Sequence, residues 1–186
     1  LNWVEASVHP IGAVGLWTSM IKIIKMAKEK GDDIIVICED DHYFTENYSP
    51  KLLFKEVTEA YIQGAEVLTG GIGGFGQAIP EGYHRYKVDW FWCTQFIVVY
   101  NRFFDKMLDY SFQDTDTADG VISKLATNKM VIFPFISEQR DFGYSDVTQS
   151  NMEQQGKIRE HFARANKRME FVSQSNMQSN IPKNYF

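Results

Sequence analysis

The chain has 186 residues, of which 44% are hydrophobic and 23% charged, the size and composition of one ordinary globular domain. Its net charge of −5 argues against a nucleic-acid-binding protein, because such proteins usually carry a basic face. The two cysteines, Cys38 and Cys93, lie too far apart for a disulfide scaffold or a zinc knuckle, and we interpret both as small buried residues. A cytoplasmic location is expected, since no signal peptide or membrane span of about 20 apolar residues is visible.

Hydrophobic periodicity predicts the elements of the first third of the chain. An apolar stripe over 16–30 predicts a helix that Gly31 ends. The β-branched run over 34–38 predicts a strand buried on both faces. Ser49, as an N-cap, followed by proline predicts a second helix that reaches residue 63.

The remainder alternates in the same way. The predicted elements are a strand at 66–69, a glycine-rich loop at 70–82, an aromatic strand region at 86–100 that is firmer from residue 94, helices at 101–109 and 116–127, a strand at 130–136 and a polar helix or loose tail at 151–171. Such alternation predicts an α/β fold with a mostly parallel sheet flanked by helices, and ligands beyond the carboxyl ends of its strands. We expect one domain over 1–150 and a polar C-terminal extension over 151–186, poorly ordered from residue 172. The extension is either a solvated arm or one that faces an acceptor or a membrane.

Three consecutive carboxylates, Glu39, Asp40 and Asp41, follow the predicted strand at 34–38. Like charges this close repel one another, and a hard divalent cation such as Mn²⁺ or Mg²⁺ would neutralise them. Strand alternation points Glu39 and Asp41 the same way, which makes them the candidate metal ligands. A solvated acidic turn is the alternative. His42 is either a further ligand or a hydrogen-bonding partner.

The segment 71–76 matches the glycine pattern of dinucleotide-binding proteins after a predicted strand. That site requires a helix to begin at the glycines, and residues 78–82, with Pro80 and Gly82, do not predict one. We therefore exclude a dinucleotide site, and expect either a loop that closes over substrate or a plain surface loop.

Two further aspartates lie near the start of the predicted helix at 116–127. Asp116 is expected to cap this helix, whose dipole favours negative charge at its first turn. Asp119 is either a similar first-turn charge or a general base that projects into a cleft. Catalysis by a serine or cysteine nucleophile has little support, because no nucleophile-elbow motif is present.

Four stretches together resemble glycosyltransferase family 25, the lipooligosaccharide galactosyltransferase type. They are Gly12-Ala-Val-Gly15-Leu-Trp-Thr-Ser19, Ile37-Cys-Glu39-Asp40-Asp41, Thr94 to Tyr100 with Met107-Leu108, and Ala118-Asp119 with Pro134, Gln139 and Ser145-Asp146. They follow one another in the family's order over 12–146, although Leu16 and Met20 stand where the family has cysteine and histidine.

The resemblance implies a GT-A-like fold that binds a nucleotide sugar, and transfer of a sugar from a donor, UDP-linked, to a glycan or lipid-linked glycan of a cell-surface polysaccharide or lipooligosaccharide. It implies that Asp41 and Glu39 bind the metal, that Glu39, Asp40 and Ser19 contact the donor, and that Asp119 is the catalytic base. A lipid-linked acceptor would add peripheral association with the inner face of the membrane.

The resemblance also leaves alternatives open. The strand and helix that build the family's nucleobase pocket have no counterpart before Leu1, so we expect an N-terminally incomplete domain. The same residues are compatible with a non-catalytic glycan- or nucleotide-binding module on a degenerate transferase fold. A different metal-dependent phosphoryl or nucleotidyl enzyme is the third interpretation.

Overall fold

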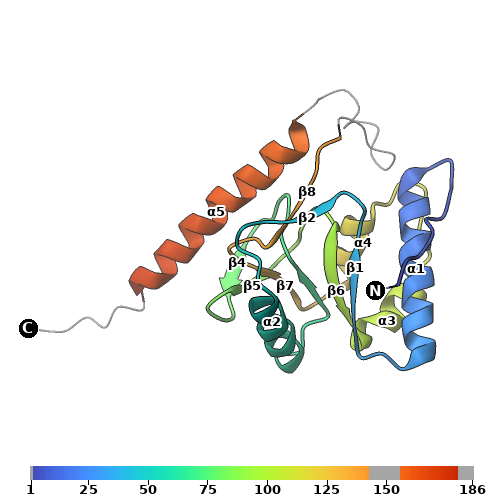
Figure 1. The fold of residues 1–186 in the computed structure, drawn as a ribbon, viewed down its shortest axis with the longest axis horizontal. Helices are drawn as coiled ribbons and strands as arrows, with labels where there is room; N and C mark the ends of the chain where they lie inside the picture. The colour runs from blue at the N-terminus through green and yellow to red at the C-terminus, as the bar shows by residue number, and fades with distance from the viewer. Residues whose placement is uncertain (1, 143–155, 180–186) are drawn as a thin grey trace, which may run out of the picture.

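The computed structural model describes residues 2–142 and 156–179, which form a mixed α/β structure (Figure 1). Its helices are α1 (Gly12–Lys30), α2 (Pro50–Ile62), α3 (Asn101–Leu108), α4 (Ala118–Leu125) and α5 (Lys157–Ser179). Its strands are β1 (Ile34–Cys38), β2 (His42–Phe44), β3 (Val67–Thr69), β4 (Ala78–Pro80), β5 (Arg85–Val88), β6 (Phe96–Tyr100), β7 (Lys129–Ile132) and β8 (Ser137–Gln139).

The main sheet has six strands in the order β1-β6-β3-β7-β5-β4, and β2 pairs with β8 in a separate ribbon. β3 and β7 are parallel, while the other neighbouring pairs of the main sheet are antiparallel. The prediction of a mostly parallel sheet was therefore wrong. β1, β3 and β7 do share one direction, but β6 is inserted between β1 and β3 and runs against both. Alternation of helices and strands does not determine which strands become neighbours.

β1 lies at an edge of the main sheet, where β6 is its neighbour. The prediction that β1 is buried on both faces was wrong, since Val36 is 47% exposed, and the interpretation of Cys38 as a buried residue was wrong as well, since it is exposed. Its β-branched residues satisfy the preference of any strand for such side chains, and that preference does not distinguish an edge from a centre.

Both faces of the sheet are covered by apolar side chains, as alternation along β6 shows. Ile97 and Val99 pack into a cluster with α1, α3 and α4. Phe96, Val98 and Tyr100 pack into a second cluster with α2. The buried aliphatic run of β6 thus separates two cores, with α2 on the opposite side of the sheet from α1 and α3 (Figure 1).

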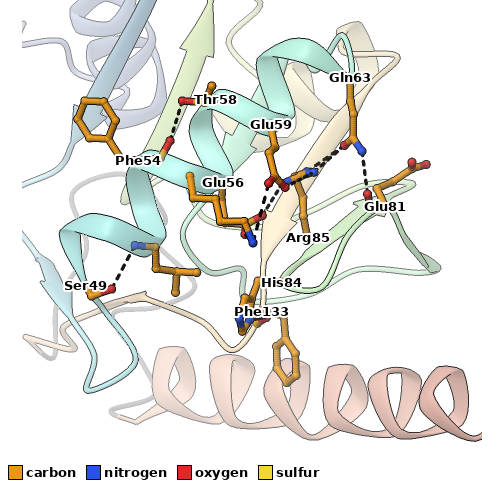
Figure 2. A network of polar contacts seen from close by, with 12 residues as sticks. Ser49, Phe54, Glu56, Thr58, Glu59, Gln63, Glu81, His84, Arg85 and Phe133 are labelled. Atoms are coloured by element: carbon orange, nitrogen blue, oxygen red, sulfur yellow. Dashed lines mark hydrogen bonds and ion pairs between the residues drawn. The ribbon is translucent and has the colours of Figure 1, made fainter.

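The start of α2 is the one that the sequence predicted. The hydroxyl of Ser49 accepts a hydrogen bond from the backbone N–H of Leu52 at 3.2 Å, and Pro50 is the first helical residue (Figure 2). Proline at this position does not destabilise the helix, because the N–H that it lacks would have no partner within the helix.

We expect Ser49→Ala to lower the free energy of unfolding by about 1 kcal/mol, since it leaves the Leu52 N–H without its cap. Chemical denaturation would measure this change. Thr58→Ala is the matched control on the same helix: its hydroxyl bonds to the Phe54 carbonyl, which already serves the helix, and the expected effect is within about 0.5 kcal/mol (Figure 2). Equal losses in the two variants would contradict a specific capping role.

A buried ion pair between Arg85 and Glu56 links β5 to α2. Arg85 and Glu56 are each 1% exposed, and the guanidinium donates to the Glu56 carboxylate. Arg85 also donates through Nε and Nη2 to Gln63 Oε1, at 3.0 and 2.9 Å, and to Glu59 Oε2 at 3.3 Å (Figure 2). Glu56 and Glu59 project from α2, and Gln63 directly follows its last residue, so one side chain of the sheet holds one face and the C-terminal end of this helix.

The N-cap of α4 is Thr117, whose hydroxyl accepts from the Gly120 N–H at 3.3 Å. The prediction that Asp116 caps this helix was wrong. Its carboxylate instead accepts from the Gln113 N–H at 2.8 Å and from the Tyr110 hydroxyl at 3.1 Å. Threonine and aspartate are both good caps, and the fold of the preceding turn decides between adjacent candidates.

Helix α5 packs on the main body rather than projecting freely, and it includes residues 172–179 that we expected to be poorly ordered. Phe162, Ala165 and Met169 are buried and belong to the same extended apolar cluster as Ile97 and Val99, and α5 contacts β4 and β8. Arg168 donates to the carbonyls of Phe75 and Gly76 at 2.6 and 2.9 Å. Ser145-Asp146 of the family resemblance and the tail from residue 180 lie outside the described residues. Within them, no helix has both the length and the apolar content needed to cross a membrane.

Candidate active site

The acidic loop that follows β1 is tied to the residues that precede β6. Glu39 donates its backbone N–H to the Gln95 carbonyl at 2.9 Å, and its Oε1 accepts from the Thr94 hydroxyl at 2.6 Å. β6 runs against β1, so its beginning lies beside the end of β1. The antiparallel pairing that the sequence did not predict therefore positions the first carboxylate.

Asp41 is held by the small ribbon of β2 and β8. Its Oδ2 accepts from Gln139 Nε2 at 2.6 Å, and its carbonyl accepts from the Arg140 N–H at 2.8 Å. Its Oδ1 is buried and accepts no hydrogen bond from the residues that the structure describes. His42, the next residue, bonds through Nδ1 to the Ser137 hydroxyl at 2.8 Å, so the hydrogen-bonding interpretation of this histidine is the one observed.

Asp119, in the first turn of α4, is brought to the same place by the segment before β6. Its Oδ2 accepts from the backbone N–H of Cys93 at 3.1 Å, and its Oδ1 from that of Gly120 at 2.8 Å. Cys93 has a φ of 75°, the left-handed conformation that residues other than glycine rarely adopt. Because Thr94 holds Glu39 and Cys93 holds Asp119, two adjacent residues bring together carboxylates from distant parts of the chain.

The electrostatics reflect this convergence. Burial raises the pKa of Glu39 to about 7, and the charges of Asp41, Asp40 and Asp119 add to the increase, against the hydrogen bond from Thr94. Burial also raises the pKa of Asp41, and the hydrogen bond from Gln139 acts in the opposite direction. A carboxyl group whose pKa is near 7 can exchange protons at neutral pH, which is the property of a general acid or base.

The same charges act on the thiol beside them. Burial, followed by the charges of Asp119 and Glu39, raises the pKa of Cys93. A thiol that stays protonated is a poor nucleophile, so Cys93 is not a candidate nucleophile and the three carboxylates are the candidate reactive groups of this region.

The glycine-rich segment lies against this site but does not form a lid. Residues 70–75 are buried, contrary to both loop interpretations. A Cβ on Gly71 would lie 2.0 Å from the Ser137 carbonyl oxygen, and one on Gly73 would lie 2.8 Å from Cys93 Sγ. The glycines thus permit close packing of the backbone. A glycine-rich sequence is compatible both with such packing and with a mobile loop, so the pattern alone could not decide between them.

The other two predicted donor residues do not share the hydrogen bonds that hold the three converging carboxylates, although the charge of Asp40 reaches Glu39. Asp40 is exposed in the turn between β1 and β2. Ser19 lies in α1, where its hydroxyl accepts from the Ser7 N–H at 2.8 Å and donates to the Gly15 carbonyl at 2.9 Å. These bonds fasten the N-terminal segment to α1, which gives Ser19 a structural use, and its contact with a donor stays a prediction.

A divalent ion at this site would have few protein ligands. The described residues contain no group of three or more histidine, cysteine, aspartate or glutamate side chains that could hold a metal. Asp41 nevertheless has one buried oxygen that accepts no hydrogen bond from the described residues. Glu39 lies close enough to Asp41 for the charge of Asp41 to raise the pKa of Glu39. These residues fit an ion of the Mg²⁺ type, which is commonly held by one or two carboxylates and completes its coordination with substrate phosphates and water.

A groove of about 840 Å³ lies between α5 and the segment that leads into β4, lined by Phe75, Ile79, Arg164, Lys167 and Phe171 among others. Its lining includes none of Glu39, Asp41 and Asp119, so this groove is separate from the carboxylate site.

Sequence reasoning identified the three carboxylates but not the residues that position them. Thr94 and Gln139 belonged to the family resemblance without an assigned role, and Cys93 was interpreted only as a small buried residue. Thr94 binds Glu39 from 55 residues away along the chain, and Gln139 binds Asp41 from 98 residues away. Cys93 binds Asp119 from 26 residues away. The sequence signal that could have indicated a role for Thr94 was its position, because it is a polar residue at the start of an apolar strand.

No protein-family model matches this chain, and no curated protein sequence matches it either. The fold class by itself supports many functions, so the function is argued from the chemistry of the site.

Proposed function

We propose that this protein is a glycosyltransferase that moves a sugar from a nucleotide donor, UDP-linked, to a glycan acceptor. The observation that carries the proposal is the convergence of Glu39, Asp41 and Asp119 at one end of the sheet, with a Glu39 pKa near 7. An acceptor of the cell-surface polysaccharide or lipooligosaccharide type is the expectation that follows from the family resemblance.

A GT-A-like arrangement of the sheet is part of the proposal. β1, β3 and β7 run in one direction, so their carboxyl ends lie on the same side of the sheet. The acidic loop follows β1, and the buried glycines follow β3. Ligands of open α/β sheets commonly bind beyond such ends, which supports a substrate site beside the acidic loop.

Sugar transfer requires one bond to break and one to form. The bond from the sugar's anomeric carbon to the diphosphate oxygen breaks, and its electron pair leaves with UDP. A bond from the same carbon to the acceptor oxygen forms, and the hydroxyl proton passes to a base. Asp119 is the base that the resemblance implies, fixed by its two backbone hydrogen bonds.

Asp41 and Glu39 are the residues that would hold Mn²⁺ or Mg²⁺ together with the donor. When bound, such an ion supplies positive charge that stabilises the departing diphosphate. The contribution of the protein is to keep Asp41 in place through Gln139 and the β2–β8 ribbon, with one carboxylate oxygen that accepts no hydrogen bond from the described residues.

Calorimetric titration of UDP with and without Mn²⁺ tests this function. We expect binding that depends on Mn²⁺ and that weakens at least about tenfold in Asp41→Asn, which keeps the shape but removes the charge. Asp32→Asn is the control, since this exposed aspartate lies at the opposite end of β1. Incubation with UDP-sugars and candidate acceptors then tests turnover.

The remaining outcomes identify the alternatives. Wild-type protein that binds no UDP under either condition, or Asp41→Asn that binds it normally, would contradict the proposal. Glycan or UDP binding without any transfer would instead support the non-catalytic binding module. Hydrolysis of phosphate esters at the same carboxylates would support a phosphoryl or nucleotidyl enzyme.

A further inference from the structure

A partly exposed tryptophan directly precedes the segment that positions the carboxylates. Trp92 is 47% exposed. It directly precedes Cys93, which holds Asp119, and lies two residues before Thr94, which holds Glu39. Consecutive Cα atoms are about 3.8 Å apart, so this ring originates within a few ångströms of the residues that hold the site.

The backbone of Trp92 is fixed by the buried glycine segment. Trp92 donates its N–H to the Gly74 carbonyl at 3.2 Å, and its carbonyl accepts from the Gly73 N–H at 3.0 Å. Its ring lies on Gly74, where an added Cβ would come within 2.7 Å of the ring atom Cε3. A side chain at residue 74 would push the indole away, so glycine at this position lets the ring rest on the backbone.

Two more rings complete the surface around Trp92. Trp90 lies with its ring centroid 5.0 Å away, and His161 of α5 approaches edge-on at 5.5 Å. Trp90 is itself placed by Asp89, whose Oδ1 accepts the N–H groups of Gly76, Gln77 and Trp90. The platform therefore combines an exposed aromatic face with supports from three separate segments of the chain.

We propose that Trp92, supported by Trp90 and His161, is the platform on which a pyranose ring of the glycan acceptor stacks. The face of an aromatic ring carries a partial negative charge, and the C–H groups on the apolar face of a pyranose carry a partial positive one. A rigid aromatic wall beside a few polar groups is a common composition of small-molecule sites. This inference rests on the proposed transferase function, because that function supplies a reason for a sugar to lie beside the carboxylates.

The choice of a sugar rather than a nucleobase follows from position. In the proposed function the diphosphate lies at Asp41, and the acceptor hydroxyl must reach Asp119. Trp92 adjoins Cys93, which holds Asp119, whereas Asp41 is held from the β2–β8 ribbon. The acceptor sugar is thus the part of the reaction nearest to Trp92.

The test measures binding of immobilised oligosaccharides that end in galactose, glucose, mannose or N-acetylglucosamine, with the best of them then titrated in solution. We expect wild-type protein to bind at least one of them, Trp92→Ala to lose at least about tenfold in affinity, and Trp92→Phe to keep most of it. Trp3→Ala is the matched control, since Trp3 is 88% exposed and belongs to the N-terminal segment. Saturation-transfer NMR on the wild-type protein should show the strongest signal on the C–H groups of one sugar face, which requires no variant to fold.

Several results would overturn the platform. They are absence of glycan binding by the wild type, equal affinity in Trp92→Ala, and equal losses in Trp92→Ala and Trp3→Ala. Loss of UDP binding in Trp92→Ala with unchanged glycan binding would assign the ring to the nucleobase instead. Failure of the transferase function is recognised separately, because it is read from the Mn²⁺-dependent UDP titration with Asp41→Asn.

Discussion

Replacing Arg85 with methionine is expected to lower the free energy of unfolding by about 3–5 kcal/mol, a large part of the stability of an ordinary domain. The substitution preserves much of the side-chain volume but leaves the 1% exposed Glu56 carboxylate without its guanidinium. Gln63 and Glu59 lose the same partner, so the face of α2 that packs on β5 loses its main polar anchor (Figure 2). Urea denaturation followed by circular dichroism would measure the loss.

Two further variants separate the buried charge from the ion pair as such. The double variant Arg85→Met with Glu56→Leu should recover much of the loss, because it leaves no unpaired charge at the buried position. Lys28→Met breaks the ion pair with Asp105, whose side chains are 55% and 69% exposed, and should cost less than about 1 kcal/mol. A similar cost in Arg85→Met and Lys28→Met would show that burial does not control the energetics here.

Replacing Glu39 with glutamine is expected to stabilise the metal-free protein above neutral pH, by about 3 kcal/mol at most. The pKa of Glu39 is raised in the folded protein from its ordinary value of 4.5 to about 7, so the folded state binds this proton more tightly than the unfolded state does. The contribution of Glu39 to stability is fully present below pH 4.5 and is lost as the pH rises through about 7. Glutamine stays neutral and can still accept from Thr94.

Thermal or urea denaturation in EDTA at about pH 4 and about pH 8 would test this dependence. The two proteins should be equally stable at the lower pH, and Glu39→Gln should be the more stable at the higher pH. Glu29→Gln, an exposed glutamate on α1, is the control and should follow the wild type at both. A difference that is the same at both pH values would mean that ionisation of Glu39 does not cause it. If removing this carboxylate stabilises the folded protein, that result would fit a residue that is retained for function rather than for stability.

Local signals in the sequence determined the parts of the fold that depend on neighbours along the chain. The β-branched run of β1, the Ser49 cap with Pro50, and the apolar stripe of α1 each specify an element through contacts within a few residues. β4, β5, β2 and β8 were missed as separate strands, because three- or four-residue strands carry too few alternating positions for a pattern to emerge.

The candidate site was visible in the sequence as three carboxylates, and its assembly was not. The strand context of Glu39 and Asp41 pointed to a site, but nothing near Asp119 indicated that Cys93 would hold it beside them. The same limit applied to Trp92: an aromatic-rich segment predicts packed core and exposed platform equally well. Burial separates the two, and burial depends on which elements cover the segment.

By itself, the sequence determined the mixed α/β class, the central helices and strands, and the acidic residues at the end of β1. Only the tertiary structure decided the strand order, the edge position of β1 and the use of the glycines as a packed support. It also decided that Glu39 and Asp119 lie in the same region, beside the segment that precedes β6. The physical reason is that hydrogen bonds and side-chain periodicity act within an element, whereas sheet order depends on how distant apolar faces bury one another. That choice involves the whole chain at once, and no short segment encodes it.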